Sequence, residues 1–287
     1  MSGVRTLEGA AGDDFWSAYE AIMGGDGLMT YRYIGSSGAT VVDPRHSTST
    51  ARVRRDMRGP SGLLAAALEI MGGDCLSIID DAIAIPAPAA YSLHVIDDGA
   101  GVEEVRVHGE ISHAGRTQLF TRFRVEDAAD PARVLALGIN TSVVLGPAPE
   151  GHRYVPPGPG VEDSPSLPPL WEAFGAVRVA PGHYEIPELN ARLGSTSASL
   201  HHGPTQVVLE AAATDVAVAA LGSEALRVAQ WTVTFLARGK VGPFVTESHV
   251  VSVGADLVTC EATLRDDGVD GRCIAMATAA FLRTGAA

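Results

Sequence analysis

Two glutamates occupy matching positions in the sequence, each inside an apolar segment that begins at a glycine. Glu69 follows Gly62 by seven residues, and Glu210 follows Gly203 by the same spacing. Seven residues are about two turns of an α-helix, so each carboxylate points roughly to the side of its glycine. A carboxylate in an apolar helix holds a proton more readily than one in water. Such a group can act as a general base or attack an acyl carbon directly, and the sequence leaves both roles open.

The start of each helix can supply the electrophilic partner of that carboxylate. The first N–H groups of a helix have no partner within it, and the helix dipole adds partial positive charge there. The amide of Gly62 or Gly203 can therefore bind an oxyanion that develops from a carbonyl group. Thr214 lies four residues after Glu210 and shares its face, whereas the matching position in the first segment is Gly73. We therefore expect the more complete site in the second segment.

Other interpretations of these residues remain open. Glu210 and Asp215 can simply face a solvated seam, and the pair His201-His202 can cap or pack the turn before the second helix. His202, next to Gly203, is also a candidate catalytic residue. No metal site is expected, since neither an H-E-x-x-H motif nor a Cys/His cluster accompanies the pair. Neither a G-x-S-x-G elbow nor a phosphate-binding glycine motif occurs in the sequence.

The elements around the two helices also repeat along the chain. The helices, predicted at 62–75 and about 204–221, match at an offset of 141 residues. A second set of residues recurs at an offset of 139: Gly115, Asp127, Arg133 and Ala136 match Gly254, Asp266, Arg272 and Ala275. A repeat of this length favours a duplicated domain over a stacked array. We therefore predict an N-terminal domain at 1–146, a connector rich in proline and glycine at 147–169, and a C-terminal domain at 170–287.

Each helix is followed by β-strand patterns that are separated by turns rich in glycine and aspartate. The predicted strands after the helices are 77–85, 92–96, 102–111, 118–125 and 134–144, then 226–236, 244–253, 257–264 and 273–282. Strand patterns also precede the helices, at 47–57 and 176–185, and a short amphipathic helix is predicted at 13–23. A helix that is apolar nearly all round must be enclosed. The expected fold class is α+β, with each half an antiparallel sheet wrapped around one central helix.

These residues resemble the hotdog-fold acyl-CoA thioesterases, in particular the group of the phenylacetate-pathway and 4-hydroxybenzoyl-CoA enzymes. The second half is similar in 200–203, in Glu210, in 233–242, in Gly254 and in 266–280. The first half is similar in fewer places, namely Gly59, Gly62, Glu69 and 115–118. The resemblance implies a tandem double hotdog, with sites at the seam between the halves. It also implies that Thr214 assists Glu210, as a threonine does in the hydroxybenzoyl enzymes.

The chain departs from the family pattern at two places. Pro204 stands where the family turn has a second glycine, which removes one backbone N–H donor, and no histidine precedes the first helix. The function we expect is hydrolysis of an acyl-CoA thioester, with coenzyme A as part of the substrate and no separate cofactor. A non-catalytic protein that binds acyl-CoA or a partner protein is the alternative. An enoyl-CoA hydratase is less favoured, because no convincing Asp/His pair is found.

Composition and charge limit the kinds of partner and the cellular location that the protein can have. A net charge of −13 argues against nucleic acid as a partner, and 46% hydrophobic residues describe a well-filled core. The three cysteines lie in apolar stretches and fit reduced, buried thiols. We expect a cytoplasmic protein that does not interact with membranes, because the sequence shows neither a signal core nor an apolar run of membrane-spanning length. A homodimer is the expected assembly.

A basic cluster lies just before the first helix. Its members, Arg52, Arg54, Arg55 and Arg58, can bind the phosphates of coenzyme A through bidentate hydrogen bonds. A solvated edge strand, whose charges discourage pairing with other sheets, is the favoured alternative.

Overall fold

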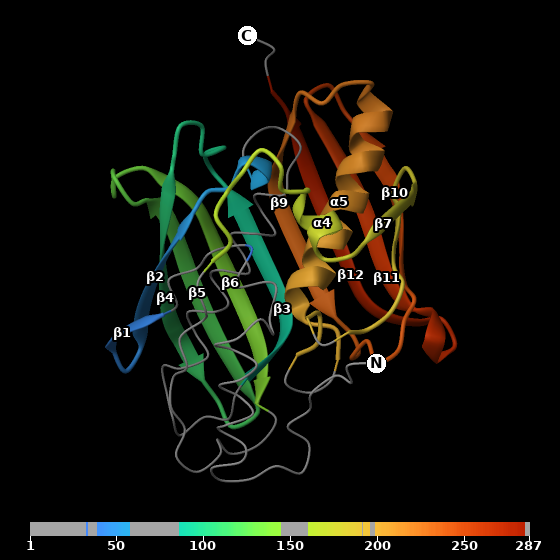
Figure 1. Ribbon diagram of the computed structural model, residues 1–287. Coiled ribbons are helices and arrows are strands. Elements are labelled where there is room, and N and C mark those ends of the chain that lie inside the picture. Colours follow the sequence, from blue (N-terminus) through green and yellow to red (C-terminus); the bar gives the residue numbers. More distant parts are fainter. Residues whose placement is uncertain are drawn as a thin grey trace.

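The described residues form a single antiparallel sheet of 12 strands with one long helix on its inner face (Figure 1). The computed structural model describes residues 33, 39–57, 86–144, 160–190, 192–195 and 199–284. The helices predicted at 13–23 and 62–75 and the strand predicted at 77–85 lie outside this part of the chain. Described elements of the first half are β1 (Thr40–Asp43), β2 (His46–Arg52), η1 (Arg55–Met57), β3 (Pro86–Val95), β4 (Glu104–Ala114), β5 (Gln118–Asp127) and β6 (Val134–Val144).

The second half contains the long helix, and most of its elements match the predicted ones. Its elements are α4 (Leu170–Ala173), β7 (Val177–Ala180), β8 (His183–Ile186), α5 (His202–Leu221), β9 (Leu226–Phe235), β10 (Phe244–Val253), β11 (Leu257–Asp266), η2 (Asp267–Val269) and β12 (Arg272–Arg283). The strand predicted at 176–185 is two strands, because Gly182 turns the chain with a φ of 73°. In the first half, the strand predicted at 47–57 ends at Arg52, where the short helix η1 follows.

The strand order has an internal symmetry. It runs β1-β2-β4-β5-β6-β3-β9-β12-β11-β10-β8-β7, so the two halves read outward from the centre in the same order. The halves join where β3 pairs with β9, with Leu93 opposite Trp231. At this junction the hydroxyl groups of Ser92 and Thr232 lie 3.4 Å apart. The expected hotdog-like α+β fold is therefore confirmed, with the central helix described in the second half only.

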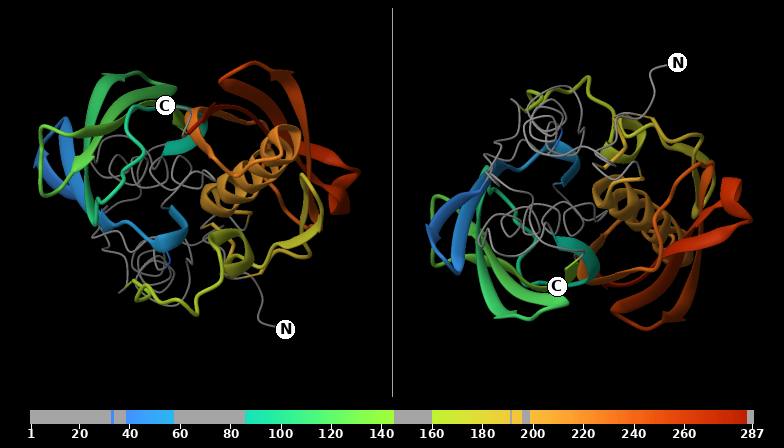
Figure 2. Two further views of the ribbon diagram at one scale, coloured as in Figure 1. Left: turned by 90° about the horizontal axis from the view of Figure 1, so that it is seen from above. Right: turned by 90° about the horizontal axis from the view of Figure 1, so that it is seen from below.

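Helix α5 is enclosed by the second half of the sheet. It packs against β10, β11, β12, β8 and α4, and the views along the sheet show it inside the curve of these strands (Figure 2). Every residue from Gly203 to Thr214 is buried, as a helix that is apolar nearly all round requires. By length and hydropathy alone α5 would also suit a membrane span, but its burial is that of a core helix. Gly222 ends it in the left-handed conformation, with a φ of 60°.

Asp215 fastens the middle of α5 to the outer strands β7 and β8. Its Oδ2 atom accepts hydrogen bonds from Arg178 Nε at 2.6 Å and from the Tyr184 hydroxyl at 3.0 Å. Burial, followed by the charge of Asp215, raises the pKa of Tyr184 above its usual value, so the phenol stays a donor. Asp215 therefore has a structural role on the side of α5 that faces β8.

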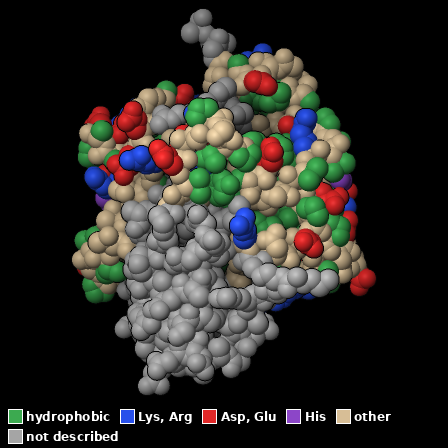
Figure 3. All heavy atoms as spheres, in the orientation of Figure 1, with side chains coloured by type: hydrophobic (Ala, Val, Ile, Leu, Met, Phe, Trp, Pro, Cys, Tyr) green, Lys and Arg blue, Asp and Glu red, His purple; other side chains and the backbone are tan. Residues whose placement is uncertain are grey.

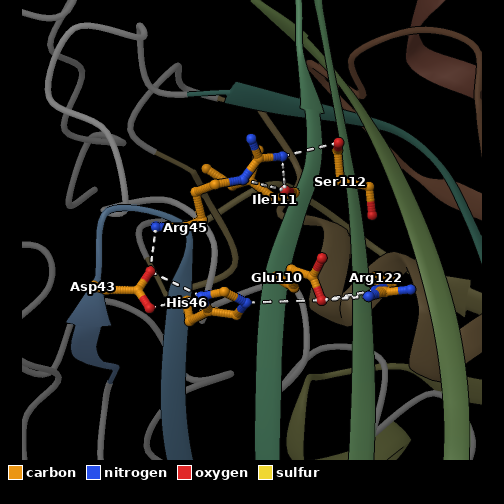
Figure 4. A network of polar contacts seen from close by, with 7 residues as sticks. All are labelled: Asp43, Arg45, His46, Glu110, Ile111, Ser112 and Arg122. Atoms are coloured by element: carbon orange, nitrogen blue, oxygen red, sulfur yellow. Dashed lines mark hydrogen bonds and ion pairs between the residues drawn. The ribbon is translucent and has the colours of Figure 1, made fainter.

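The outer face of the first half carries charged side chains that link neighbouring strands. In Figure 4, His46 lies between Asp43 at 2.8 Å and Glu110 at 3.8 Å, and Glu110 pairs with Arg122 at 2.7 Å. Arg45 donates to the backbone oxygen of Ile111, which ties the β1–β2 turn to β4. Figure 3 shows acidic and basic side chains interspersed over the described part of the face in view. Such charges near the edge strand β1 discourage pairing with another sheet.

The two halves fill corresponding core positions with different volumes. In the first half Phe123 lies opposite Gly138, where a Cβ atom would overlap the Phe123 ring. The residues 139 positions later are Ala262 and Ala277, which also lie opposite each other and are buried. One half thus uses a large and a small residue where the other uses two of intermediate size.

This packing predicts that Gly138→Ala destabilises the protein. The added methyl group cannot fit unless the Phe123 ring moves, and overpacking of this kind costs about 1–3 kcal/mol. Urea denaturation measures the change in the free energy of unfolding. Ala277→Gly serves as the control, because it removes a methyl group from the corresponding site and introduces no overlap. The double variant Gly138→Ala with Phe123→Ala, which reproduces the pair of the second half, should be less destabilised than Phe123→Ala alone. If Gly138→Ala changed the free energy of unfolding equally in the wild type and in the Phe123→Ala variant, this account would be contradicted.

Candidate functional site

The candidate site begins at the N-terminus of α5, where the His201 side chain caps the helix. The amide of Gly203 donates to His201 Nδ1 at 3.3 Å. The backbone oxygen of His201 accepts from the Thr205 hydroxyl at 3.1 Å. Gly203, predicted as an oxyanion donor, thus lies at the start of the helix as expected, but its N–H has an acceptor inside the protein.

Four polar side chains follow one another along α5 at intervals of four residues. These residues, called here the polar stripe, are His202, Gln206, Glu210 and Thr214. Residues four apart lie on one face of a helix, so the stripe forms a single, slowly turning row. Gln206 and Glu210 are fully buried, and Thr214 is 8% exposed. Three of the four were predicted from the sequence as site residues, and Gln206 was not.

The first turn of the polar stripe lies at the junction of the two halves. The ring of His202 has its centre 6.3 Å from that of Tyr91 on β3 and 6.5 Å from that of Phe235 on β9. Tyr91 and Phe235 in turn meet edge to face, with centres 5.9 Å apart. Tyr91 comes from the first half and the other two rings from the second. This end of the stripe therefore lies at the seam between the halves, where the resemblance to the family implies a site.

Gln206 is oriented by a tryptophan of the central strand β9. The indole Nε1 of Trp231 donates to Gln206 Oε1 at 3.1 Å, and both side chains are fully buried. An indole N–H can only donate, so the oxygen of the amide must face it. The amide nitrogen then points the other way, and among the described residues it has no hydrogen-bond partner. The Nε2 atom of His202 and the hydroxyl of Thr214 are likewise buried without a described partner.

The two histidines at the start of α5 are neutral in the folded protein. Burial, followed by the neighbouring His202, lowers the pKa of His201 well below its usual value. Burial also lowers the pKa of His202 to about 4. The residue as a whole is partly exposed, but its Nε2 atom is buried. Their ring centres are 3.9 Å apart, so charging both would be unfavourable. A neutral His201 is also what the cap requires, because Nδ1 must accept from Gly203.

These pKa values predict a loss of stability on the acid side. Unfolded histidine binds a proton near pH 6.5, whereas His202 in the folded protein does so only near pH 4. Below pH 6.5 the unfolded chain binds more protons than the folded one, so the free energy of unfolding decreases as the pH falls. At pH 4.5 it should be about 1–3 kcal/mol lower than at neutral pH. The pKa of Asp97 is lowered by Arg133, so its contribution is lost only at still lower pH.

Urea denaturation between pH 7.5 and 4.5 measures this loss. His201→Asn keeps a capping side chain that does not titrate in this range. The variant should therefore lose less stability on acidification than the wild type. The same slope in both proteins would show that His201 does not contribute.

A buried carboxylate holds the loop next to the start of α5. Asp266, fully buried at the end of β11, accepts hydrogen bonds from the backbone N–H groups of Lys240 at 2.6 Å, Val241 at 3.1 Å and Gly242 at 2.8 Å. The carbonyl of Gly239 in this loop accepts from Leu200 N at 2.8 Å, one residue before the cap. Asp266 was predicted as a repeated residue and not as part of the site.

The arginines of the predicted basic cluster differ in their exposure to solvent. Arg54 is 3% exposed and donates to Asp56 at 2.9 Å, so its charge is paired inside the protein. Arg52 and Arg55 are exposed, and β2 is flanked by β1 rather than lying at the edge of the sheet. Arg58 lies outside the described residues, as do the candidate site residues Glu69 and Gly62. The proposed contact with coenzyme A therefore depends on Arg52 and Arg55 among the described residues.

The described part of the chain offers no metal site and no activated buried thiol. Within those ranges, no group of three or more His, Cys, Asp or Glu residues could hold a metal ion. Cys260 is buried, which raises the pKa of its thiol to about 12 and makes it a poor nucleophile. Cys260 and Cys273 are free thiols, and Cys75 lies outside the described residues.

A family model and several solved structures match this chain. The model of the acyl-CoA thioesterase N-terminal domain matches residues 192–282, which include α5 and the strands β9–β12. Residues 192–282 are thus similar to an acyl-CoA thioesterase domain. The matched segment contains the whole polar stripe and Asp266. The model describes an N-terminal domain but matches the second half of this chain. Such a match is expected if the two halves have the same fold.

The solved structures extend the similarity over both halves. A tesB protein from Mycobacterium avium subsp. paratuberculosis has a TM-score of 0.58 at 12% identity, covering 86% of this chain and 96% of that one. The acyl-CoA thioesterase II TesB2 of Mycobacterium marinum has a TM-score of 0.54 at 11% identity, with coverage of 86% and 96%. A hot dog fold protein of unknown function from Alicyclobacillus acidocaldarius has a TM-score of 0.55 at 11% identity, with coverage of 90% and 98%. No curated protein matches the sequence. At these identities the structures show the fold alone, and their similarity extends over both halves of the chain.

Proposed function

We propose that the chain hydrolyses acyl-CoA thioesters at the polar stripe of α5. The observation that carries the proposal is a fully buried Glu210 in the middle of that stripe, inside the segment that matches the thioesterase model and two turns from a seam-facing helix N-terminus. Hydrolysis needs a polarised carbonyl, an activated water and an enclosed acyl chain. The helix end, the carboxylate and the apolar surroundings of α5 meet these needs in that order.

In the proposed reaction, Glu210 takes a proton from water as the water oxygen bonds to the acyl carbon. The carbonyl electrons move to the oxygen, which the positive end of α5 stabilises. Collapse of this intermediate breaks the C–S bond, and the thiolate of coenzyme A leaves and takes up a proton. Thr214, one turn beyond Glu210, assists the carboxylate. Direct attack by Glu210 to form an anhydride is the other route compatible with this geometry.

The repeated plan supports a duplicated organisation with unequal halves. We propose hotdog domains at 1–146 and 170–287, joined by the connector at 147–169. Within the connector, the described residues 160–169 contain no helix or strand. The mirrored strand order and the exchange of Phe123 and Gly138 for Ala262 and Ala277 support this division.

Thiol release from a panel of short, long and aromatic acyl-CoAs tests the proposed function. Turnover with at least one of them is the expected result. The second candidate, a non-catalytic acyl-CoA-binding protein, is favoured by one feature of the turn: Pro204 lacks an N–H, and the N–H of Gly203 already donates to His201. Calorimetry that shows acyl-CoA binding without thiol release would favour this candidate over the first.

A further inference from the structure

The start of α5 offers fewer oxyanion donors than a helix terminus ordinarily does. Pro204 has no N–H, the N–H of Gly203 donates to His201 Nδ1 at 3.3 Å, and the N–H of Thr205 donates to the His201 carbonyl at 3.3 Å. These amides are held by the cap itself. A thioesterase site built here needs a donor from another group, since stabilising the developing negative charge is a large part of catalysis in acyl transfer.

The side-chain amide of Gln206 has the properties of such a donor. It lies in the first turns of α5 and is fully buried. The indole of Trp231 fixes its orientation, because Gln206 Oε1 must face the N–H at 3.1 Å. Its Nε2 group therefore has a defined direction and no acceptor among the described residues. An oriented donor that awaits an acceptor needs little reorganisation when charge develops nearby.

A buried amide nitrogen without a partner also requires an explanation of its own. Leaving a buried donor unsatisfied is unfavourable, and most buried polar groups in proteins are paired. The bond from Trp231 accounts for the oxygen of the amide but leaves its nitrogen unexplained. Gln206 lies one helical turn before Glu210 on the same face, so a substrate carbonyl beside Glu210 is within the reach of the amide. A ligand oxygen that binds there would satisfy the group.

We propose that Gln206 is the side-chain oxyanion donor of the site, and that Trp231 is its positioning residue. The inference rests on the proposed thioester hydrolysis at Glu210. As water adds to the acyl carbon and Glu210 takes its proton, the carbonyl oxygen gains negative charge and accepts a hydrogen bond from Gln206 Nε2. When the C–S bond breaks, the carbonyl forms again and the thiolate departs. Gln206 donates throughout and exchanges no proton with the substrate.

Two substitutions of Gln206 test this role by steady-state kinetics on the best acyl-CoA. Gln206→Met has no donor, so kcat should fall by about 10²–10³-fold, while KM changes far less. Gln206→Glu is isosteric and keeps an oxygen for Trp231. Its carboxyl group donates only when protonated, so its loss of kcat should grow as the pH rises, unlike that of Gln206→Met.

Two further variants separate this role from a packing role. Thr48 on β2 also has a buried hydroxyl without a described partner, so Thr48→Val is a matched control and should keep kcat. Trp231→Phe leaves the amide in place without its orienting bond. The variant should therefore lower kcat less than Gln206→Met does. Circular dichroism establishes that each variant is folded at the assay temperature.

The outcomes distinguish this inference from the proposed function. A wild-type chain without turnover on any acyl-CoA would overturn both. An active wild type with a folded Gln206→Met variant of unchanged kcat would overturn the role of Gln206 alone. If Gln206→Met does not fold, the isosteric Gln206→Glu decides, and a kcat equal to that of the wild type at every pH would overturn the role.

Discussion

The Glu210→Gln variant is expected to lose acyl-CoA hydrolysis by about 10²–10⁴-fold, the range that a general base contributes. Glutamine has nearly the same volume and can still accept hydrogen bonds, but it cannot take a proton from water or attack as a carboxylate. Because Glu210 is fully buried in a well-packed helix, the isosteric change should leave the melting temperature nearly unchanged. Thiol release under saturating substrate measures the loss, and thermal unfolding establishes that the fold is intact.

The matched control for this variant lies on the same helix. Asp215 also carries a carboxylate, but it bonds to Arg178 and Tyr184 on the side that faces β7 and β8. Asp215→Asn should lower the melting temperature and keep most of kcat. If Glu210→Gln kept full turnover while Asp215→Asn lost it, the catalytic carboxylate would lie on the other side of α5.

The largest loss of stability is expected for Asp266→Ala, at about 3–5 kcal/mol. The variant removes the fully buried carboxylate of Asp266. Three backbone N–H groups of the loop 240–242 then have no acceptor. Each unsatisfied buried donor costs about 1–3 kcal/mol, and the bonds to a carboxylate are stronger than those to a neutral acceptor. Urea denaturation measures the change in the free energy of unfolding.

The sequence repeat supplies the control for this variant. Asp127 occupies the position equivalent to Asp266, but its carboxylate accepts from Ala129 N at 2.9 Å within its own turn and lies 3.9 Å from Arg133. The corresponding loop of the first half is held instead by Arg133, which pairs with Asp97 at 2.7 Å. Asp127→Ala should cost about 1 kcal/mol. Equal losses in the two variants would mean that Asp266 has no special role in its loop.

The parts of the fold that depend on local pattern could be predicted from the sequence. Helix α5 was placed within two residues at its start, because a segment that is apolar all round and ends at a glycine is typical of a buried helix. Strands β4, β5, β6 and β9–β12 were recognised from their alternation and from the turns between them. The pairing of β3 with β9 was not predicted residue by residue, since it joins segments about 140 positions apart.

The candidate site was predicted only where spacing along one helix defines it. Glu210 was proposed because it repeats Glu69 seven residues after a glycine, and Thr214 because residues four apart share a helix face; the catalytic roles of both stay predictions. Gln206 was missed as a site residue, because its importance comes from Trp231, a contact that only the tertiary structure brings about. The capping role of His201 and the pairing of Arg54 with Asp56 likewise depend on contacts that spacing and composition do not determine.

The difference between the halves follows from the same residues. The first half has Gly73 where the second has Thr214, and it has alanine at position 65, which matches Gln206 at the offset of 141. Two of the four residues of the polar stripe thus have no polar counterpart in the first half. We infer that the chain has one complete site, on α5, although the described strands of the two halves follow the same order.

The most direct test of this account is thiol release by Glu210→Gln and Glu69→Gln, compared side by side with the wild type on the same acyl-CoA. Because the complete set of polar groups lies on α5, Glu210→Gln should be nearly inactive and Glu69→Gln should keep most of the wild-type kcat. An inactive Glu69→Gln beside a fully active Glu210→Gln would contradict the account, since it would place the reaction in the other half of the chain.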